Sequence, residues 1–265
     1  MQKQRVDVGG VSINYLKVGH GPHTLLCNPG VMGTIWTDFK PQIVSLDKSK
    51  FTLIAWDPPG HGKSRPPDVE YDPDFYNRGA EFTVKFLKAL NVGKLSILGW
   101  SNGGIQGMII AAKYPELIEA LVLWGAKAYI VKGEVDYLQG LKSSPAWAGS
   151  IKAEQKAYDD HDYFVNSMKK FVARLTHIYN NDGDFCKDAL SQIHCPVLVM
   201  HGEGDLLVFD EHPHYLVEHI KGAKLECFKS GKHHIHLKHP DKFNRLVEDF
   251  LTEQLGHKSV ISSKL

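Results

Sequence analysis

The stretch LSILGWSNGGIQGMIIAAKYP, residues 95–115, decides the fold of this chain. Its first six residues form an apolar run of strand length, and residues 105–114 are apolar on all sides, which predicts a buried helix. Between them, residues 99–103 (GWSNG) match the pattern G-x-S-x-G. A serine at such a strand-to-helix junction lies on a sharp turn with its hydroxyl exposed at the edge of the sheet. We therefore predict that Ser101 is a nucleophile.

The regions on both sides of this stretch repeat the alternation of strand and helix. Short apolar runs rich in β-branched and aromatic residues are separated by longer segments with helical spacing, which is typical of a mainly parallel sheet with helices on both faces. Residues 74–90 are expected to form one such amphipathic helix. The predicted strands are residues 11–18, 24–28, 51–57, 94–100, 120–124, 196–201 and 224–228. The fold class is therefore α/β.

This alternation stops between residues 125 and 193, where Lys, Asp and aromatic residues follow one another at helix-like spacing. We interpret residues 127–190 as a helical insertion between two strands and call it the lid. An extra helical layer on the same domain is the alternative. Residues 1–126 and 191–256 then form the core, and the polar residues 257–265 are expected to be a flexible tail.

The sequence contains 15 His, and a serine nucleophile needs one of them as its base. His233 follows the last predicted strand, at the edge of the sheet where Ser101 is expected. Its neighbour His234 is the rival candidate, while His236 and His239 are expected on the following helix. A metal site is the alternative for this cluster, but acidic ligands for it are not evident. We expect no metal and no cofactor.

The imidazole needs an acid that holds it in one tautomer and stabilises its positive charge. Asp205 follows the predicted strand 196–201, so it lies at the same edge of the sheet, and the chain order becomes Ser, Asp, His. Glu203 is interpreted as a structural loop residue. Glu134 or Asp136, which follow the preceding strand, remain the alternative acids.

Acyl transfer also needs N–H donors aimed at the oxygen of the tetrahedral intermediate. The backbone N–H of Asn102 is one candidate, because it begins the helix behind Ser101. The loop 28–33 (NPGVMG) leaves an earlier strand, and we assign the second donor to the N–H of Val31. A plain glycine-rich turn is the alternative for this loop.

Several segments of the chain resemble the biphenyl hydrolase-like proteins, the group that includes valacyclovir hydrolase. Residues 55–67 (AWDPPGHGKSRPP) resemble the WDPxGxGxSRPP segment of that group. Further matching segments are 98–105 (LGWSNGGI), 112–115 (AKYP), 124–126 (WGA), 231–233 (GKH), 236–237 (HL), 243–244 (FN) and 248–251 (EDFL). The resemblance covers residues 10–252. It implies the α/β-hydrolase fold with an inserted helical lid over the acyl pocket, and Ser101, Asp205 and His233 as the catalytic triad.

One residue departs from this family's pattern. Members that cleave α-amino-acid esters carry Asp directly after the nucleophilic Ser, where its carboxylate binds the substrate ammonium, whereas this chain has Asn102. An amide accepts a hydrogen bond from an ammonium but supplies no charge. Asn102 is thus a candidate substrate-binding residue with weak expected selectivity for the amine. An acid of the lid, Asp159, Asp160 or Asp162, is the alternative partner for an ammonium.

The resemblance and the predicted triad imply a serine carboxylic ester hydrolase that forms an acyl-enzyme with a small ester, esters of α-amino acids included. A C–C bond hydrolase of dienone acids or a thioesterase on the same scaffold is the alternative. For an acyl-CoA substrate, the only hint of a basic entrance is a set of lysines, Lys152, Lys156, Lys169 and Lys170. A non-catalytic ligand-binding member of the fold would usually lack Ser, His or the acid, and all three are present.

Composition and charge exclude other classes of function. Lys and Arg number 31 against 30 Asp and Glu, so nucleic acid is not an expected partner. The first ten residues lack the apolar region of a signal peptide, and no apolar run reaches the length of a membrane-spanning helix. The four Cys form no CxxC pair, so we expect neither a zinc site nor a disulfide framework, which fits a reducing compartment.

The last three residues are Ser263, Lys264 and Leu265. A free C-terminal S-K-L is an address that the peroxisomal import receptor binds. The sequence therefore predicts that receptor as a partner and a peroxisomal location, or a cytoplasmic one if the tripeptide is not at a natural, accessible terminus.

Overall fold

The computed structural model describes residues 4–142 and 156–262. Its strands are β1 Gln4–Val8, β2 Val11–Val18, β3 His23–Asn28, β4 Phe51–Trp56, β5 Leu95–Trp100, β6 Ile118–Trp124, β7 Val197–Gly202 and β8 Lys224–Phe228. Its helices are α1 Ile35–Asp38, α2 Lys40–Ser45, α3 Phe75–Ala89, α4 Asn102–Lys113, α5 Lys132–Lys142, α8 His161–Asn181, α9 Lys187–Leu190, α10 Glu211–His219, α11 Ile235–Lys238 and α12 Pro240–Ser262. All seven predicted strands and both predicted helices are present, with bounds shifted by at most a few residues.

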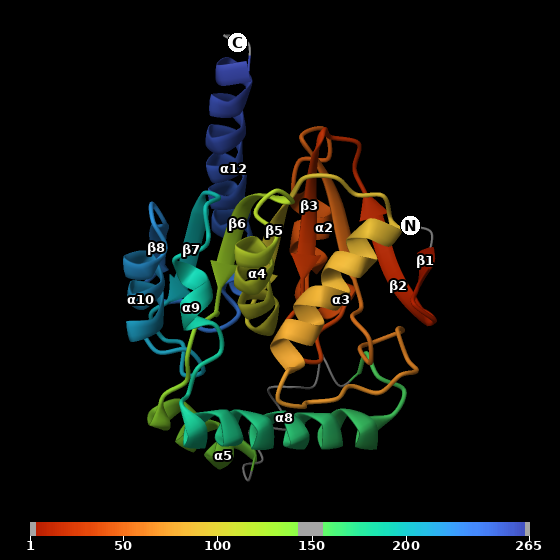
Figure 1. The fold of residues 1–265 in the computed structure, drawn as a ribbon, viewed down its shortest axis with the longest axis vertical. Helices are drawn as coiled ribbons and strands as arrows, with labels where there is room; N and C mark the ends of the chain where they lie inside the picture. The colour runs from red at the N-terminus through yellow and green to blue at the C-terminus, as the bar shows by residue number, and fades with distance from the viewer. Residues whose placement is uncertain (1–3, 143–155, 263–265) are drawn as a thin grey trace.

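The strands form an eight-stranded sheet in the order β1-β2-β4-β3-β5-β6-β7-β8 (Figure 1). The pairs β1–β2 and β2–β4 are antiparallel, and every pair from β4 to β8 is parallel. The predicted α/β fold with a mainly parallel sheet is thus confirmed. The prediction missed β1 because only Val8 of this edge strand is buried, which leaves the apolar signal weak.

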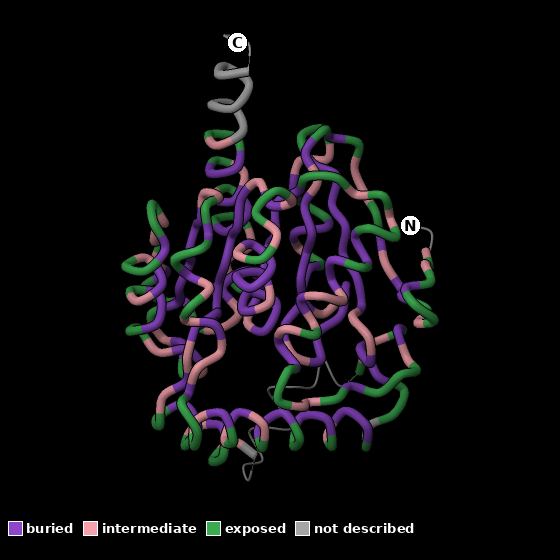
Figure 2. The backbone as a smooth tube through the Cα atoms, viewed as in Figure 1, coloured by how far each residue is buried: buried purple, intermediate pink, exposed green. Residues whose placement is uncertain are grey.

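Helices cover both faces of the sheet, and each face has its own apolar core. Side chains of α3, α4 and α10 pack on one face, and those of α1, α2, α11 and α12 on the other. The central strands β4, β5 and β7 are buried over their whole length (Figure 2). Their nearly continuous apolar sequences follow from this two-sided burial.

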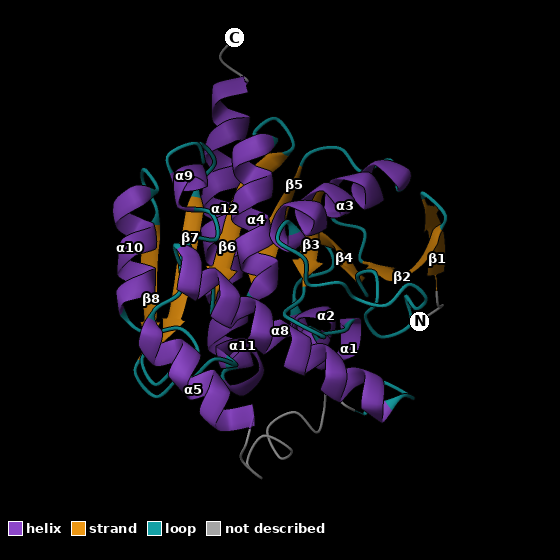
Figure 3. Cartoon of the chain, turned by 60° about the horizontal axis from the view of Figure 1, so that its bottom comes forward, coloured by secondary structure: helices purple, strands orange, loops and turns teal. Residues whose placement is uncertain are grey.

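The lid supplies helices α5, α8 and α9 in the predicted range. Helix α8 crosses below the sheet and packs against α5 (Figures 1 and 3). Its N-cap is Asp160, whose side chain accepts the backbone N–H of Tyr163 at 2.9 Å. Lys152 of the predicted basic entrance lies outside the described residues.

Residues 257–262 of the predicted flexible tail are helical. Helix α12 continues to Ser262 and projects from the body of the molecule (Figure 1). No proline interrupts residues 241–262, so the chain can extend the helix that begins on the core. The Ser263–Leu265 tripeptide lies outside the described residues, and its role as a peroxisomal address stays a prediction. Among the described helices, none has the length and apolar character needed to cross a membrane.

Candidate active site

Ser101 stands at the tight turn between β5 and α4. Its backbone angles are φ 53° and ψ −120°, a left-handed conformation that a non-glycine residue adopts only when its surroundings enforce it. Its N–H donates to the carbonyl of Trp124 at 3.0 Å, which ties the turn to the neighbouring strand β6. The predicted strand–turn–helix setting of the G-x-S-x-G segment is therefore present.

The glycines of this segment allow the backbone to pack closely. A Cβ at residue 103 would lie 2.1 Å from the carbonyl oxygen of Asn28, and one at residue 99 would lie 2.8 Å from the Cα of Gly104. Both distances are too short for any side chain. The buried Asn28 amide also donates to the carbonyl of Gly103 at 2.9 Å. Shape and backbone contacts therefore fix the position of Ser101.

His233 and Asp205 form a close pair at the ends of β8 and β7. Nδ1 of His233 lies 2.8 Å from Oδ2 of Asp205, and the other carboxylate oxygen accepts the N–H groups of Leu207 and Val208. Burial alone would raise the pKa of Asp205, but the charge and hydrogen bond of His233 and these two N–H donors outweigh it and lower the pKa. Asp205 thus stays ionised and holds the Nδ1–H tautomer, which leaves Nε2 with the lone pair.

The other histidines of the cluster have different surroundings. His234 packs against the indole of Trp100, and burial, reinforced by the charge of His233, lowers its pKa to about 4. His236 is fully buried, and its Nδ1 accepts the indole N–H of Trp124 at 2.8 Å. Of the two candidate bases, His233 has its Nδ1 2.8 Å from a carboxylate, that of Asp205, which is suited to orient the ring.

The two alternative acids lie elsewhere. Asp136 pairs with Lys132 on the surface of α5. Glu134 is fully buried, with Lys127 Nζ at 2.8 Å from one carboxylate oxygen and His212 Nε2 at 2.9 Å from the other. Neither contacts His233 in the hydrogen bonds or ion pairs of the described residues.

Lys127 and Glu134 contact the loop that carries Asp205. The ammonium of Lys127 donates to the carbonyl of Leu207 at 2.8 Å, and Glu134 accepts the N–H of Phe209 at 3.1 Å. This role of Lys127 was not predicted from the sequence. A lysine directly after the buried run of β6 was the available signal, because a charge there must find a partner.

The loop predicted to complete the oxyanion hole makes a tight turn above Ser101. Gly30 donates its N–H to the buried carboxylate of Asp38 at 3.0 Å, and Met32 has a positive φ of 55°. The carbonyl of Met32 accepts the hydroxyl of Tyr158 at 2.9 Å, so the lid also contacts this loop. Val31 and Asn102 both line the cavity that contains Ser101.

That cavity has a volume of about 340 Å³ and brings together Ser101, Asp205 and His233. Lid side chains form its apolar wall, namely Leu138, Leu141, Phe164, Met168, Phe171 and Leu175. The lid aspartates Asp159, Asp160 and Asp162 are exposed and do not line it. They are therefore not partners for an ammonium beside Ser101, and that alternative was wrong.

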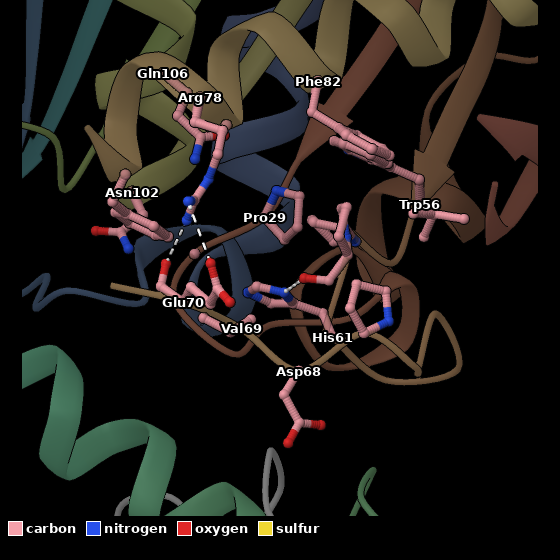
Figure 4. Close-up of a pocket in the computed structure, with 17 residues that line it drawn as sticks. Pro29, Trp56, His61, Asp68, Val69, Glu70, Arg78, Phe82, Asn102 and Gln106 are labelled. Atoms are coloured by element: carbon pink, nitrogen blue, oxygen red, sulfur yellow. Dashed lines mark hydrogen bonds and ion pairs between the residues drawn. The ribbon is translucent and has the colours of Figure 1, made fainter. Parts of the chain in front are cut away.

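A second cavity of about 290 Å³ adjoins the first at Gly30 and Asn102, the two residues that line both. Figure 4 shows Asn102 at one edge of this second cavity, with Arg78 and Gln106 close by. Arg78 donates to the backbone carbonyl of Glu70 at 2.7 Å, so its guanidinium is already engaged by the protein. Among the described residues no group of three or more His, Cys, Asp and Glu is arranged to hold a metal ion.

Comparisons with known proteins agree with this geometry. The family model described as "alpha/beta hydrolase fold" matches residues 23–175. The chain belongs to the α/β-hydrolase family. Serine hydrolase BPHL of Mus musculus is 42% identical over 93% of this chain and 85% of its own length, and the Homo sapiens protein is 41% identical over the same shares. The predicted resemblance to the biphenyl hydrolase-like group is confirmed, and the chain is a hydrolase.

Solved structures of the family have the same fold. A serine hydrolase of carbazole degradation, the CarC enzyme, superimposes with a TM-score of 0.74 at 25% identity, covering 95% of this chain and 98% of that one. A lipase-like protein from Acinetobacter baumannii gives a TM-score of 0.81 at 19% identity, covering 97% of this chain and 92% of that one, which shows the shared fold alone. The α/β-hydrolase architecture with flanking helices is thus established for this hydrolase.

Proposed function

We propose that this hydrolase cleaves small carboxylic esters through an acyl-enzyme on Ser101, with His233 as the base and Asp205 as the acid. The observation that carries the proposal is the 2.8 Å contact between His233 Nδ1 and Asp205 Oδ2 beside the cavity that contains Ser101. Acyl transfer requires a histidine base beside a serine on a strained turn. It also requires a buried carboxylate that binds the ring nitrogen not used by the serine, here Nδ1.

The reaction proceeds in two half-reactions. Nε2 of His233 takes the proton of the Ser101 hydroxyl as its oxygen attacks the ester carbonyl, and Asp205 stabilises the imidazolium that forms. The backbone N–H groups of Val31 and Asn102 donate to the oxyanion. His233 then protonates the departing alcohol, and in the second half-reaction it activates the water that releases the acid and regenerates Ser101.

Other reactions on this scaffold receive less support from the site. Two relatives that are 27% identical over most of this chain are hydrolases of dienoic acids, from Metapseudomonas resinovorans and Pseudomonas putida. Among the described residues that line the cavity, no contact favours that chemistry over ester cleavage. Lys169 and Lys170, predicted as part of a basic entrance for acyl-CoA, are exposed on α8 and do not line the cavity.

The proposal is tested by the reaction of the protein with a fluorophosphonate probe, followed by hydrolysis of simple alkyl, aminoacyl and CoA esters. We expect labelling of Ser101 and turnover of alkyl esters. Ser101→Ala should remain folded, lose the label and lose activity by about 10⁴-fold or more. An active, folded Ser101→Ala protein would exclude the serine mechanism.

A further inference from the structure

The side-chain amide of Asn102 leaves one polar atom without a partner. The residue is 6% exposed, and its Nδ2 has no hydrogen bond among the described residues. Of the described residues that line the cavity around Ser101, Asn102 is the one with such a buried atom. Buried polar atoms in proteins nearly always have a partner, so an unpaired donor beside the nucleophile indicates a group that arrives with the substrate.

Tyr76 fixes which end of the amide is free. Its hydroxyl, from helix α3, contacts Asn102 Oδ1 at 3.3 Å. Tyr76 is 6% exposed, and burial raises the pKa of its phenol, so the hydroxyl keeps its proton and donates it. If the amide were turned over, its NH₂ group could donate to the phenol oxygen, but the hydroxyl hydrogen of Tyr76 would lose its acceptor. The orientation with Oδ1 toward Tyr76 satisfies both groups and leaves the NH₂ group unpaired.

The charges around the cavity favour the same kind of ligand. Asp205 is the one carboxylate among its described lining residues, and both of its oxygens are occupied by His233 and backbone N–H groups. Lys232 also lines the cavity, whereas the ammonium of Lys127 is already paired with Glu134. Asn102 itself begins helix α4, whose first N–H groups have no partner within the helix. A substrate group at this place therefore meets hydrogen-bond donors. It meets no unpaired carboxylate among the described lining residues.

We propose that this hydrolase takes esters whose acyl part carries an oxygen acceptor on the carbon next to the scissile carbonyl, as in 2-oxo acids, and that the Asn102 side chain donates to that oxygen. The proposal rests on the proposed function, because it places the acyl group on Ser101. Asn102 directly follows the nucleophile, and its backbone N–H is the proposed donor to the oxyanion. Its side chain also lines the cavity that contains Ser101, so we place it against a substituent on the adjacent carbon.

Three ethyl esters of nearly equal shape test this assignment. Ethyl 2-oxoisovalerate offers an acceptor, valine ethyl ester offers a cationic donor, and ethyl isovalerate offers neither. The measurement is kcat/KM for each ester with wild type and with Asn102→Asp, which replaces the donor by an acceptor of the same size and keeps the backbone N–H. Ratios are compared between proteins, so the different intrinsic reactivities of the esters cancel.

We expect the ratio of 2-oxoisovalerate to isovalerate to fall about tenfold or more in Asn102→Asp, because a donated hydrogen bond is replaced by repulsion. The ratio of the valine ester to isovalerate should rise by about the same factor, since the new carboxylate attracts the ammonium. Equal ratios in the two proteins would overturn the assignment of Asn102.

Tyr76→Phe tests the orientation of the amide independently of any new charge. Without the phenol hydroxyl, Oδ1 is free to turn toward the substrate, so the preference for the 2-oxo ester should decrease. Tyr114→Phe is the matched control, because Tyr114 lines neither cavity and its hydroxyl contacts Glu81. This control should keep the wild-type ratios, and a loss as large as that of Tyr76→Phe would overturn the role of Tyr76.

The outcomes separate this inference from the proposed function. If wild type neither reacts with a fluorophosphonate nor hydrolyses ethyl isovalerate, the ester-hydrolase proposal fails and the inference fails with it. If it hydrolyses all three esters and the ratios do not change in Asn102→Asp, the function stands and the substrate class is wrong.

Discussion

The two sides of the site are held in place by different forces. On the nucleophile side, Gly99 and Gly103 let backbone segments approach so closely that a single added carbon would overlap them. On the acid–base side, Asp205 and its loop are held by hydrogen bonds and by the buried pair Lys127–Glu134. Steric packing therefore fixes the first side and electrostatics the second.

This difference has consequences for how each side responds to change. Contacts between backbone atoms do not depend on pH or on salt, and they tolerate no added volume. A buried charge network depends on every partner, because removing one leaves another buried and uncompensated. Glu134 belongs to the lid helix α5 and Lys127 to the segment after β6, so the acid–base side also depends on the docking of the lid.

The largest effect is expected from an added methyl group on the nucleophile side. In Gly103→Ala the new Cβ would overlap the carbonyl oxygen of Asn28, which is backbone and cannot move aside. We expect loss of the folded protein, measured by circular dichroism and thermal unfolding. Gly93→Ala is the matched control, since nothing lies within 4 Å of its Cβ position. A stable Gly103→Ala protein would refute steric control of this side.

Next in size is the difference between two neighbouring histidines on the acid–base side. His233→Ala should lower kcat/KM for a simple ester by about 10⁴-fold, because it removes the proposed base. His234→Ala should retain most of the activity, since the Asp205 carboxylate accepts the Nδ1–H of the His233 ring at 2.8 Å and that residue is the proposed base. The opposite result would place the base one residue later in the chain.

A smaller but still large effect is expected from the buried pair. Glu134→Gln leaves the Lys127 ammonium buried without its counter-ion, and loss of one such partner costs about 3–5 kcal/mol of unfolding free energy. The double variant Lys127→Met/Glu134→Leu removes both charges and should regain much of that loss. Urea unfolding of the three proteins measures both values. Equal stability of wild type and Glu134→Gln would show that the pair contributes nothing.

The smallest effect concerns pH. Burial lowers the pKa of His234 to about 4, whereas the pKa of a histidine in the unfolded chain is about 6.5. As pH falls below about 6.5, the unfolded state binds the proton first, so stability decreases until the folded pKa is reached. Over this pH range, one such histidine lowers the free energy of unfolding by up to about 1.4 kcal/mol per pH unit. His234→Gln should therefore lose less stability than wild type between pH 7 and pH 5, while Gly93→Ala should follow wild type. Identical pH slopes for His234→Gln and wild type would contradict this.

Much of the fold could be predicted because its signals are local. Continuous apolar runs identified the buried strands, and the glycines around Ser101 identified the strand-to-helix turn before any contact was known. Edge strand β1 was missed since only one of its side chains is buried. The helical conformation of residues 257–262 at the end of helix α12 was not predicted, because helix continuation depends on backbone hydrogen bonds that polarity does not report.

By itself the sequence determined the mainly parallel sheet, the turn that presents Ser101 and the candidate acid and base, because parallel strands place their carboxyl ends at one edge. Only the tertiary structure decided between His233 and His234 as the partner of Asp205, and brought Lys127 and Glu134 to the acid loop. It also showed that Tyr76 occupies one end of the Asn102 amide. These are contacts between residues far apart in the chain, and the spacing of residues along a sequence carries no information about which of them meet.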